Sequence, residues 1–253
     1  MTALDTAYNY GGFSSHRTLR ITASDLLDEF EISTKVGFFP DSHDLTPVRL
    51  RDAIAQCADD LGRVPNTTLL HNPECSPADY MSACDVLADA TEHGLCQAWG
   101  LSSWDPRALL AYVHHSRLMR PDVVMVRAGL TVPAPVLAAG EHLIEQAMPR
   151  ELWGMAPFDH DPADPLWSTV DTRMFLTPDQ QATTLQAGVA VAFALPPVTR
   201  LAVGTCRLDH LAELHQACRL APNVRTVRRY RALLDQKATT VQAAIDKEAV
   251  NQP

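Results

Sequence analysis

Seven short apolar segments recur along the chain, and a longer amphipathic stretch follows most of them. Most of these segments begin roughly 30 residues apart, which is the length of one strand–helix unit. Each is short and apolar enough to be a buried parallel strand. The expected strands are 3–7, 31–36, 67–71, 97–102, 122–127, 151–157 and 200–204. This alternation restricts the chain to an α/β fold with parallel strands.

The stretches between these segments have the features of amphipathic helices. Residues 47–60 place Leu50, Ile54 and Cys57 on one apolar stripe. Several stretches begin with a small polar residue followed by proline, which is typical of helix starts. Helices are expected at 47–60, 78–92, 106–115, 133–147, 178–194 and 209–219, with a C-terminal helix at 223–246. Residues 157–178 are rich in Asp and Pro and predict a long loop after the sixth strand.

Two architectures share this alternation, the TIM-type (β/α) barrel and the doubly wound sheet. No G-x-G-x-x-G run follows the first strand, which favours the barrel. The pattern contains seven recognisable strand–helix units, so we expect an incomplete barrel in a single domain over residues 1–253. An incomplete barrel leaves unpaired strand edges, which folds normally avoid. Either a unit is missing upstream, or something else covers the open edge. The candidates are a partner subunit, such as a second copy of the chain in a homo-oligomer, and the C-terminal stretch.

Composition excludes several classes of function. The net charge is -9, which argues against nucleic-acid and anionic-membrane partners because phosphate binding needs a basic surface. No apolar run approaches the ~20 residues of a membrane-spanning helix, and the N-terminus does not have the pattern of a signal peptide. The six cysteines form no C-x-x-C pair, and the one adjacent histidine pair, His114 and His115, would point apart. We expect a cytoplasmic protein with reduced thiols and no metal site.

Four polar residues lie at or just beyond the ends of the first three strands. Asp5 and Tyr10 follow the first strand, Lys35 ends the second and His71 ends the third. The carboxyl ends of barrel strands converge on one rim, so these side chains are expected to share a pocket. An ammonium group beside a phenol favours the phenolate, so Lys35 would tune Tyr10 as an acid. Asp5 would hold Lys35 by an ion pair, and His71 would bind the substrate oxygen or relay a proton.

These residues resemble the catalytic tetrad of the aldo-keto reductase family. The D-T-A-x-x-Y-G run that ends at Gly11, the strand-end Lys35 and the L-L-H run that ends at His71 carry the resemblance, which covers nearly the whole chain. It implies a (β/α)8 barrel and NADPH-dependent reduction of the carbonyl group of a small molecule. By this resemblance Tyr10 protonates the carbonyl oxygen, Lys35 and Asp5 tune Tyr10, and His71 orients the substrate.

Two later segments resemble the parts of the family that bind the cofactor. G-L-S-S-W at 100–104 resembles the segment beside the nicotinamide, and V-G-T at 203–205, followed by D-H-L-A-E-L, resembles the segment that binds the cofactor phosphate. The resemblance implies these cofactor-binding residues: Ser102, Ser103, Gly204, Thr205, Arg207 and Glu213.

The sequence departs from the family pattern mainly on the cofactor side. The family's first strand has no counterpart, and Ser103 stands where the family has an asparagine that holds the nicotinamide carboxamide. Met125 stands for a glutamine, Met155 for an aromatic residue and Leu214 for an asparagine. A thioether does not replace an amide that both donates and accepts. Arg207 is the nearby cation for a 2'-phosphate.

Three hypotheses follow from this pattern. The first is an aldo-keto reductase-like oxidoreductase that uses NADPH, on the strength of the complete tetrad. The second is a cofactor-independent lyase, dehydratase or isomerase that uses Tyr10, Lys35 and His71 for proton transfer, because the acid–base residues are kept while nicotinamide contacts are lost. The third is a non-catalytic binding subunit that completes its barrel with a partner.

Overall fold

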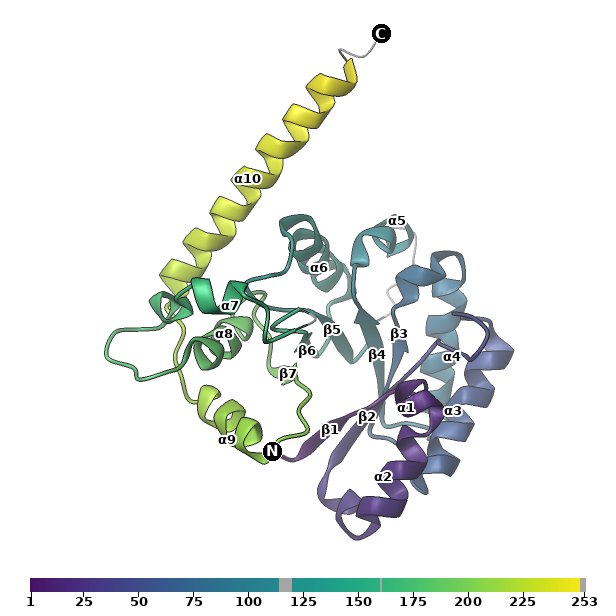
Figure 1. Cartoon of the computed structure of the whole chain (residues 1–253). Helices are drawn as coiled ribbons and strands as arrows, with labels where there is room; N and C mark the ends of the chain where they lie inside the picture. Colours follow the sequence, from purple (N-terminus) through teal and green to yellow (C-terminus); the bar gives the residue numbers. More distant parts are fainter. Residues whose placement is uncertain (114–119, 160, 251–253) are drawn as a thin grey trace. The chain divides into compact units, whose positions relative to one another are not determined.

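The computed structural model describes residues 1–113, 120–159 and 161–250. Within them lies a seven-stranded sheet whose strands follow one another in chain order (Figure 1). The strands are β1 (Ala3–Asp5), β2 (Glu31–Val36), β3 (Thr67–His71), β4 (Ala98–Ser103), β5 (Val123–Arg127), β6 (Glu151–Met155) and β7 (Arg200–Ala202). Sequential order with helical connections is the topology of a TIM-type barrel.

The first five strands pair in parallel. Leu4 lies opposite Ile32, and Lys35 lies opposite Leu69. The register continues from β3 through β4 to β5, with His71 opposite Ser102. Parallel pairing in this register brings the carboxyl ends of β1, β2 and β3 to the same edge of the sheet, where polar side chains can meet.

Helices occupy most of the connections. They are α1 (Tyr10–Phe13), α2 (Ser15–Ala23), α3 (Pro47–Leu61), α4 (Tyr80–Glu92), α5 (Leu110–Val113), α6 (Ala134–Ala147), α7 (Leu166–Thr169), α8 (Thr184–Ala192), α9 (Leu208–Ala217) and α10 (Val224–Val250). Short 3-10 helices cover Ser24–Glu29, Pro73–Cys75, Pro77–Asp79, Pro106–Ala108 and Thr172–Phe175. None of the described helices has the length and hydropathy needed to cross a membrane.

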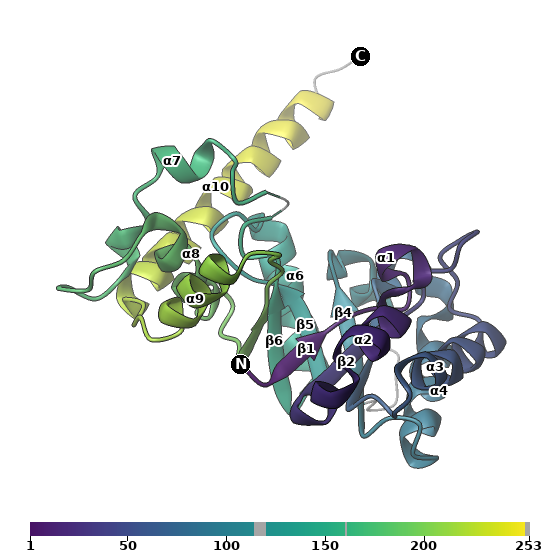
Figure 2. The ribbon, with the colours of Figure 1, turned by 60° about the horizontal axis from the view of Figure 1, so that its bottom comes forward.

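The chain divides into two compact units, and the first contains residues Met1–Val126 and His142–Trp153. Helices α2, α3 and α4 lie side by side outside the strands of this unit (Figure 2). Its largest core cluster joins helix residues such as Leu50 and Leu87 to strand residues such as Leu70 and Leu101, all fully buried. Burying one such leucine side chain contributes about 1.5–3 kcal/mol, so this core fixes the strand ends that carry the polar residues.

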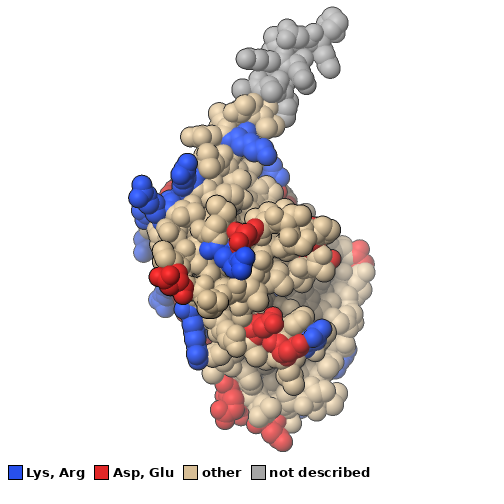
Figure 3. Space-filling view, turned by 60° about the vertical axis from the view of Figure 1, so that its left-hand side comes forward, with Lys and Arg blue, Asp and Glu red and all other residues tan. Residues whose placement is uncertain are grey.

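The second unit contains residues Arg127–Glu141 and Gly154 to the C-terminus. Its core includes Leu137, Val191 and Val227. The Tyr230 hydroxyl of α10 donates to the carbonyl oxygen of Leu130 at 2.7 Å, which ties the start of α10 to this core. Figure 3 shows Lys and Arg side chains near the exposed end of the second unit. Of the four arginines that lie close together in the expected C-terminal helix, Arg225, Arg228 and Arg229 are exposed, whereas Arg231 is partly buried and pairs with Glu141.

The sequence-based boundaries agree closely for strands β2 and β3 and less well elsewhere. The helix expected at 178–194 begins at Thr184, because the Thr183 hydroxyl and the Gln186 side chain form a reciprocal cap there. The expected long loop at 157–178 contains two four-residue helical turns, α7 and a 3-10 helix. The pair His114 and His115 lies outside the described residues.

Candidate active site

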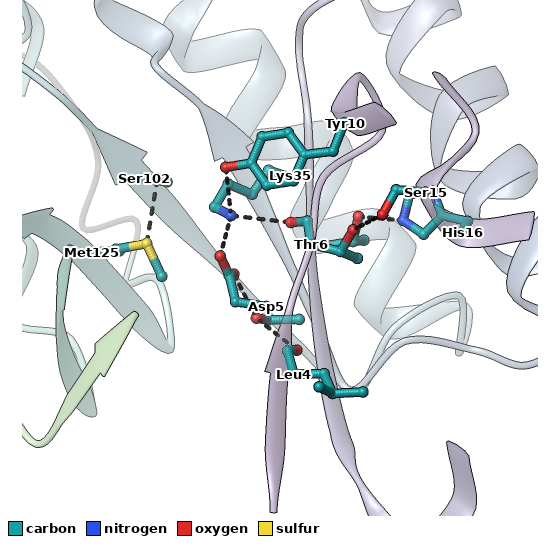
Figure 4. A network of polar contacts seen from close by, with 11 residues as sticks. Leu4, Asp5, Thr6, Tyr10, Ser15, His16, Lys35, Ser102 and Met125 are labelled. Carbon is teal, nitrogen blue, oxygen red and sulfur yellow. Dashed lines mark hydrogen bonds and ion pairs between the residues drawn. The ribbon is translucent and has the colours of Figure 1, made fainter. Parts of the chain in front are cut away.

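Lys35 lies at the centre of a polar network at the ends of β1 and β2. Its ammonium nitrogen is 2.5 Å from Asp5 Oδ2, 3.0 Å from the carbonyl oxygen of Thr6 and 3.5 Å from the Tyr10 hydroxyl oxygen (Figure 4). The Lys35 side chain is only 2 % exposed. An ammonium group has three hydrogens, and here each has an oxygen acceptor, so the buried charge is fully compensated.

Asp5 is held at both carboxylate oxygens. Oδ2 accepts from Lys35, and Oδ1 accepts from the Ser33 hydroxyl at 2.7 Å. Ser33 lies on β2 two residues before Lys35, so the two side chains that contact Asp5 come from the same face of one strand. This arrangement fixes the carboxylate and thereby the ammonium group that it pairs with.

Tyr10 begins a left-handed turn. Gly11 and Gly12 have φ values of 59° and 62°, a conformation that glycine adopts without cost. Phe13 continues the turn at φ 66°, where its ring packs edge-on against Tyr8 at 5.5 Å between centroids. The turn leaves Tyr10 41 % exposed while its hydroxyl reaches back to Lys35. A phenol placed in this way can meet a small molecule on one side and a fixed positive charge on the other.

His71 lies beside Tyr10 at the end of β3. Its ring centroid is 5.9 Å from that of Tyr10 and 4.9 Å from that of Phe38. Burial, with a smaller contribution from the nearby Lys35 charge, lowers the pKa of His71 from 6.5 to about 3. His71 is therefore neutral near pH 7. Among the described residues its buried Nδ1 has no hydrogen-bond partner, so the proton is best placed on Nε2, where it can be donated to a ligand.

The end of β4 carries a contact that the sequence does not reveal. The Ser103 hydroxyl donates to Glu74 Oε2 at 2.9 Å. Glu74 Oε1 accepts from the backbone N–H groups of Trp104 at 2.6 Å and Asp105 at 2.9 Å. Glu74 lies three residues after His71 in a short 3-10 helix. Because the Ser103 hydroxyl donates its hydrogen to Glu74, it does not donate to a ligand in this arrangement. No periodic signal distinguishes such a residue from a solvated loop carboxylate.

Ser102 and Met125 face one another across β4 and β5. The Ser102 hydroxyl lies 3.5 Å from the Met125 sulfur, and both side chains are buried. The Met125 thioether has no hydrogen to donate. Neither Ser102 nor Met125 therefore supplies a side-chain amide that would hold a carboxamide.

The remaining predicted cofactor residues form a local group in the second unit. Gly204, Thr205 and Arg207 precede α9 and are exposed, and Glu213 lies within α9. The Arg207 N–H donates to the Thr205 hydroxyl at 3.1 Å, and Arg207 Nε donates to Asp209 Oδ1 at 3.0 Å. The hydrogen bond from Arg207 lowers the pKa of Asp209 to about 2.

Comparison with known proteins identifies the family of the chain. The sequence pattern of the aldo/keto reductase family matches residues 1–135, which is more than half of the chain. The chain belongs to the aldo-keto reductase family. The matched region contains all four members of the tetrad and the β4 end. A comparison with curated protein sequences found no match.

Solved aldo-keto reductases share the fold. An aldo-keto reductase from Bacillus halodurans is 17 % identical with a TM-score of 0.69, covering 92 % of this chain and 82 % of that one. One from Klebsiella pneumoniae, solved in complex with NADPH, is 14 % identical with a TM-score of 0.70, covering 92 % and 80 %. A third from Pseudomonas aeruginosa is 20 % identical with a TM-score of 0.63, covering 87 % and 78 %. These likenesses confirm the predicted TIM-type (β/α) barrel class.

Proposed function

We propose that the chain reduces the carbonyl group of a small aldehyde or ketone, with Tyr10 as the general acid and NADPH as the hydride donor. The observation that carries this proposal is the fully compensated, buried Lys35 ammonium 3.5 Å from the exposed Tyr10 hydroxyl. Burying an ammonium group costs free energy that a purely structural role rarely repays. Placed against a phenol, the charge stabilises the phenolate that remains after proton donation.

The residues of the tetrad divide the work. The Nε2–H of neutral His71 donates to the carbonyl oxygen and orients it toward Tyr10. Tyr10 then passes its proton to that oxygen as negative charge develops there, and Lys35 stabilises the phenolate left behind. Asp5, held by Ser33, keeps Lys35 in place. A reduced nicotinamide, when bound, would supply the hydride for the carbonyl carbon. The Tyr10 phenolate regains a proton from solvent.

The residues present fit the phosphate end of such a cofactor. The exposed loop before α9 offers the Thr205 hydroxyl and the N–H groups at the start of a ten-residue helix, which can bind phosphate. The Arg207 guanidinium would also bind phosphate on exchanging its present partner, the Asp209 carboxylate. Gly204 would let the loop approach the phosphate, and Glu213 would contact the adenosine part. Ser102 and Ser103 would lie beside the nicotinamide.

A second candidate function is favoured by the contact between Glu74 and Ser103. The Ser103 hydroxyl donates to Glu74, and the Met125 side chain has no donor. These two positions therefore offer no donor to a nicotinamide carboxamide, whereas the acid–base residues are all present. A cofactor-independent lyase or isomerase needs the tetrad alone. Such a reaction would use Tyr10 and His71 for proton transfer at a carbonyl or hydroxyl group.

The deciding experiment is a titration of the purified chain with NADPH and NADH, followed by nucleotide fluorescence. We expect micromolar NADPH binding, weakened in Arg207→Ala and unchanged in Arg219→Ala, an exposed arginine at the other end of α9. Reduction of 4-nitrobenzaldehyde by the wild type and its loss in Tyr10→Phe would complete the case. Absence of NADPH binding at millimolar concentration would refute the reductase and leave the proton-transfer enzyme.

A further inference from the structure

The loop after β2, residues 37–44, folds back on itself as a compact hairpin that we call the β2 clasp. The Asp44 N–H donates to the carbonyl oxygen of Gly37 at 2.9 Å, and the Phe39 N–H donates to that of Ser42 at 2.8 Å. Phe38 and His43 form an antiparallel bridge between the two arms. These contacts give the clasp a defined shape. A loop that only connected β2 to α3 would not need them.

One arginine fixes the turn of the clasp to α3. Arg49 Nη2 lies 2.6 Å from Asp41 Oδ1, and Arg49 Nη1 lies 3.1 Å from the Ser42 hydroxyl and 3.2 Å from Asp44 Oδ2. Its guanidinium carbon is 4.0 Å from the centroid of the Phe39 ring. A single exposed ion pair contributes little, but one planar guanidinium that meets four partners fixes their relative positions.

His43 of the clasp contacts the backbone of His71. Its Nε2 lies 2.9 Å from the His71 carbonyl oxygen, and its Nδ1 lies 2.8 Å from the Ser76 hydroxyl. A carbonyl oxygen only accepts, so His43 Nε2 carries the proton, and in the neutral ring Nδ1 accepts from Ser76. Ser76 follows the same strand end as His71, so His43 joins the clasp to β3 at two points.

The clasp also packs against the ring of His71. The Phe38 centroid is 4.7 Å from that of His43 and 4.9 Å from that of His71, both edge-on. Gly37 permits this approach, because at its φ of 141° a Cβ atom would lie 3.1 Å from the His71 carbonyl oxygen. The His71 ring thus has two edge-on aromatic neighbours, Phe38 and Tyr10.

The His71 ring has no anchoring hydrogen bond of its own. Functional histidines are usually oriented by a hydrogen bond at the nitrogen that does not face the ligand. Among the described residues nothing pairs with His71 Nδ1, which is buried. The direction of Nε2 must then be fixed by the position of the backbone and by packing of the ring.

We propose that the β2 clasp positions His71 for donation to the substrate oxygen, with His43 as the positioning residue that holds the His71 backbone and Phe38 as the one that confines its ring. This proposal rests on the proposed function in one respect only, the assignment of the His71 Nε2–H as the donor to the substrate oxygen.

The test compares His43→Ala, His43→Gln and Ser76→Ala with the wild type. His93→Ala, at an exposed position of another helix end, is the matched control. Long-range ¹H–¹⁵N spectra of the ligand-free protein report the tautomer and environment of the His71 ring directly. We expect a dominant Nε2–H tautomer in the wild type, in the control and in His43→Gln, which keeps an N–H donor, and mixed or broadened His71 signals in His43→Ala.

Turnover of 4-nitrobenzaldehyde with NADPH gives the second readout. In His43→Ala kcat falls about tenfold or more with little change in KM, because misplacing a catalytic group by a fraction of an ångström slows the chemical step. His43→Gln restores most of that loss. Should His43→Ala not fold, Ser76→Ala, which removes the hydroxyl that contacts His43 Nδ1 and the His43 carbonyl oxygen, must still perturb the His71 signals.

Unchanged His71 signals in His43→Ala, or in Ser76→Ala where it is the variant available, would overturn the proposal whatever the activity. Perturbed signals that His43→Gln fails to restore would also overturn the role of the donated hydrogen bond. Because the spectra need neither cofactor nor substrate, a chain that reduces no carbonyl compound refutes the proposed function without affecting this test.

Discussion

The Lys35 ammonium nitrogen lies 3.5 Å from the hydroxyl oxygen of Tyr10, and the charge is almost completely buried. The two groups come from different strand–helix units, 25 residues apart in the chain. Their proximity therefore results from the parallel pairing of β1 and β2. The ammonium group therefore lies beside the Tyr10 phenol before it donates a proton and beside the phenolate afterwards.

Replacing Tyr10 by phenylalanine removes the proposed acid and little else. Turnover should fall about 10²- to 10⁴-fold, the usual contribution of a positioned acid. The free energy of unfolding should change by less than about 1 kcal/mol, because the side chain is 41 % exposed and Lys35 keeps two acceptors. Steady-state kinetics and urea denaturation measure the two effects. Full turnover in Tyr10→Phe would remove Tyr10 from both enzymatic hypotheses.

Replacing Lys35 by methionine removes the positive charge but keeps a long, unbranched side chain in its place. The phenolate loses its stabilising charge, so turnover should fall and the pH of maximal rate should rise. Asp5 would keep only the Ser33 hydroxyl as a side-chain partner, which should cost about 1–3 kcal/mol of stability. The pH–rate profile is the decisive measurement, with Lys237→Met on the exposed face of α10 as the control. An unchanged profile would mean that Lys35 is structural.

His71 should make the protein less stable in mild acid. Its folded-state pKa is lowered from 6.5 to about 3, so below pH 6.5 the unfolded chain takes up a proton that the folded chain does not. Stability is therefore lost as the pH falls from 6.5 toward 3. The wild type should lose about 1 kcal/mol more than His71→Gln between pH 7.5 and 5.5.

Urea denaturation at a series of pH values tests this, with His93→Gln as the control for loss of a histidine. His16 is also buried with a lowered pKa, so both proteins retain its share of the acid sensitivity. Parallel curves for the wild type and His71→Gln would show that His71 is not held neutral by burial.

The sequence predicts the strands and the tetrad for the same physical reason. The bounds of β2 and β3 agree with the expected ranges 31–36 and 67–71. β2 is not uniformly apolar, since only Ile32 and Val36 in it have apolar side chains, so its prediction depended on the spacing of the strand–helix units as well. Because the carboxyl ends of parallel strands meet at one edge of the sheet, Lys35 and His71 were expected to lie close together there.

What the sequence did not predict depends on loops that fold back onto strand ends. Glu74 and His43 each contact a residue about 30 positions away through a loop with no periodic pattern. The hairpin of the β2 clasp is stabilised by Arg49, which the sequence shows only as one charged residue of an amphipathic helix. Such contacts depend on the final path of the chain, which neither periodicity nor residue spacing encodes.

The carboxylate of Glu74 should both stabilise the end of β4 and oppose binding of a carboxamide there. In Glu74→Ala the Ser103 hydroxyl and two backbone N–H groups lose this acceptor, which should cost about 1–2 kcal/mol of stability. The freed hydroxyl can then donate to a nicotinamide carboxamide. One added hydrogen bond should strengthen NADPH binding by about threefold to tenfold.

Glu74→Gln distinguishes the two effects, because its amide oxygen still accepts from the backbone while its charge is gone. Urea denaturation and NADPH fluorescence titration should show nearly full stability with intermediate affinity, and Glu92→Ala on the exposed face of α4 should match the wild type in both. Weaker NADPH binding in Glu74→Ala would show instead that the carboxylate, by holding the β4 end in shape, supports the cofactor site. The loss of the family's asparagine at Ser103 would then be compensated by Glu74 rather than aggravated by it.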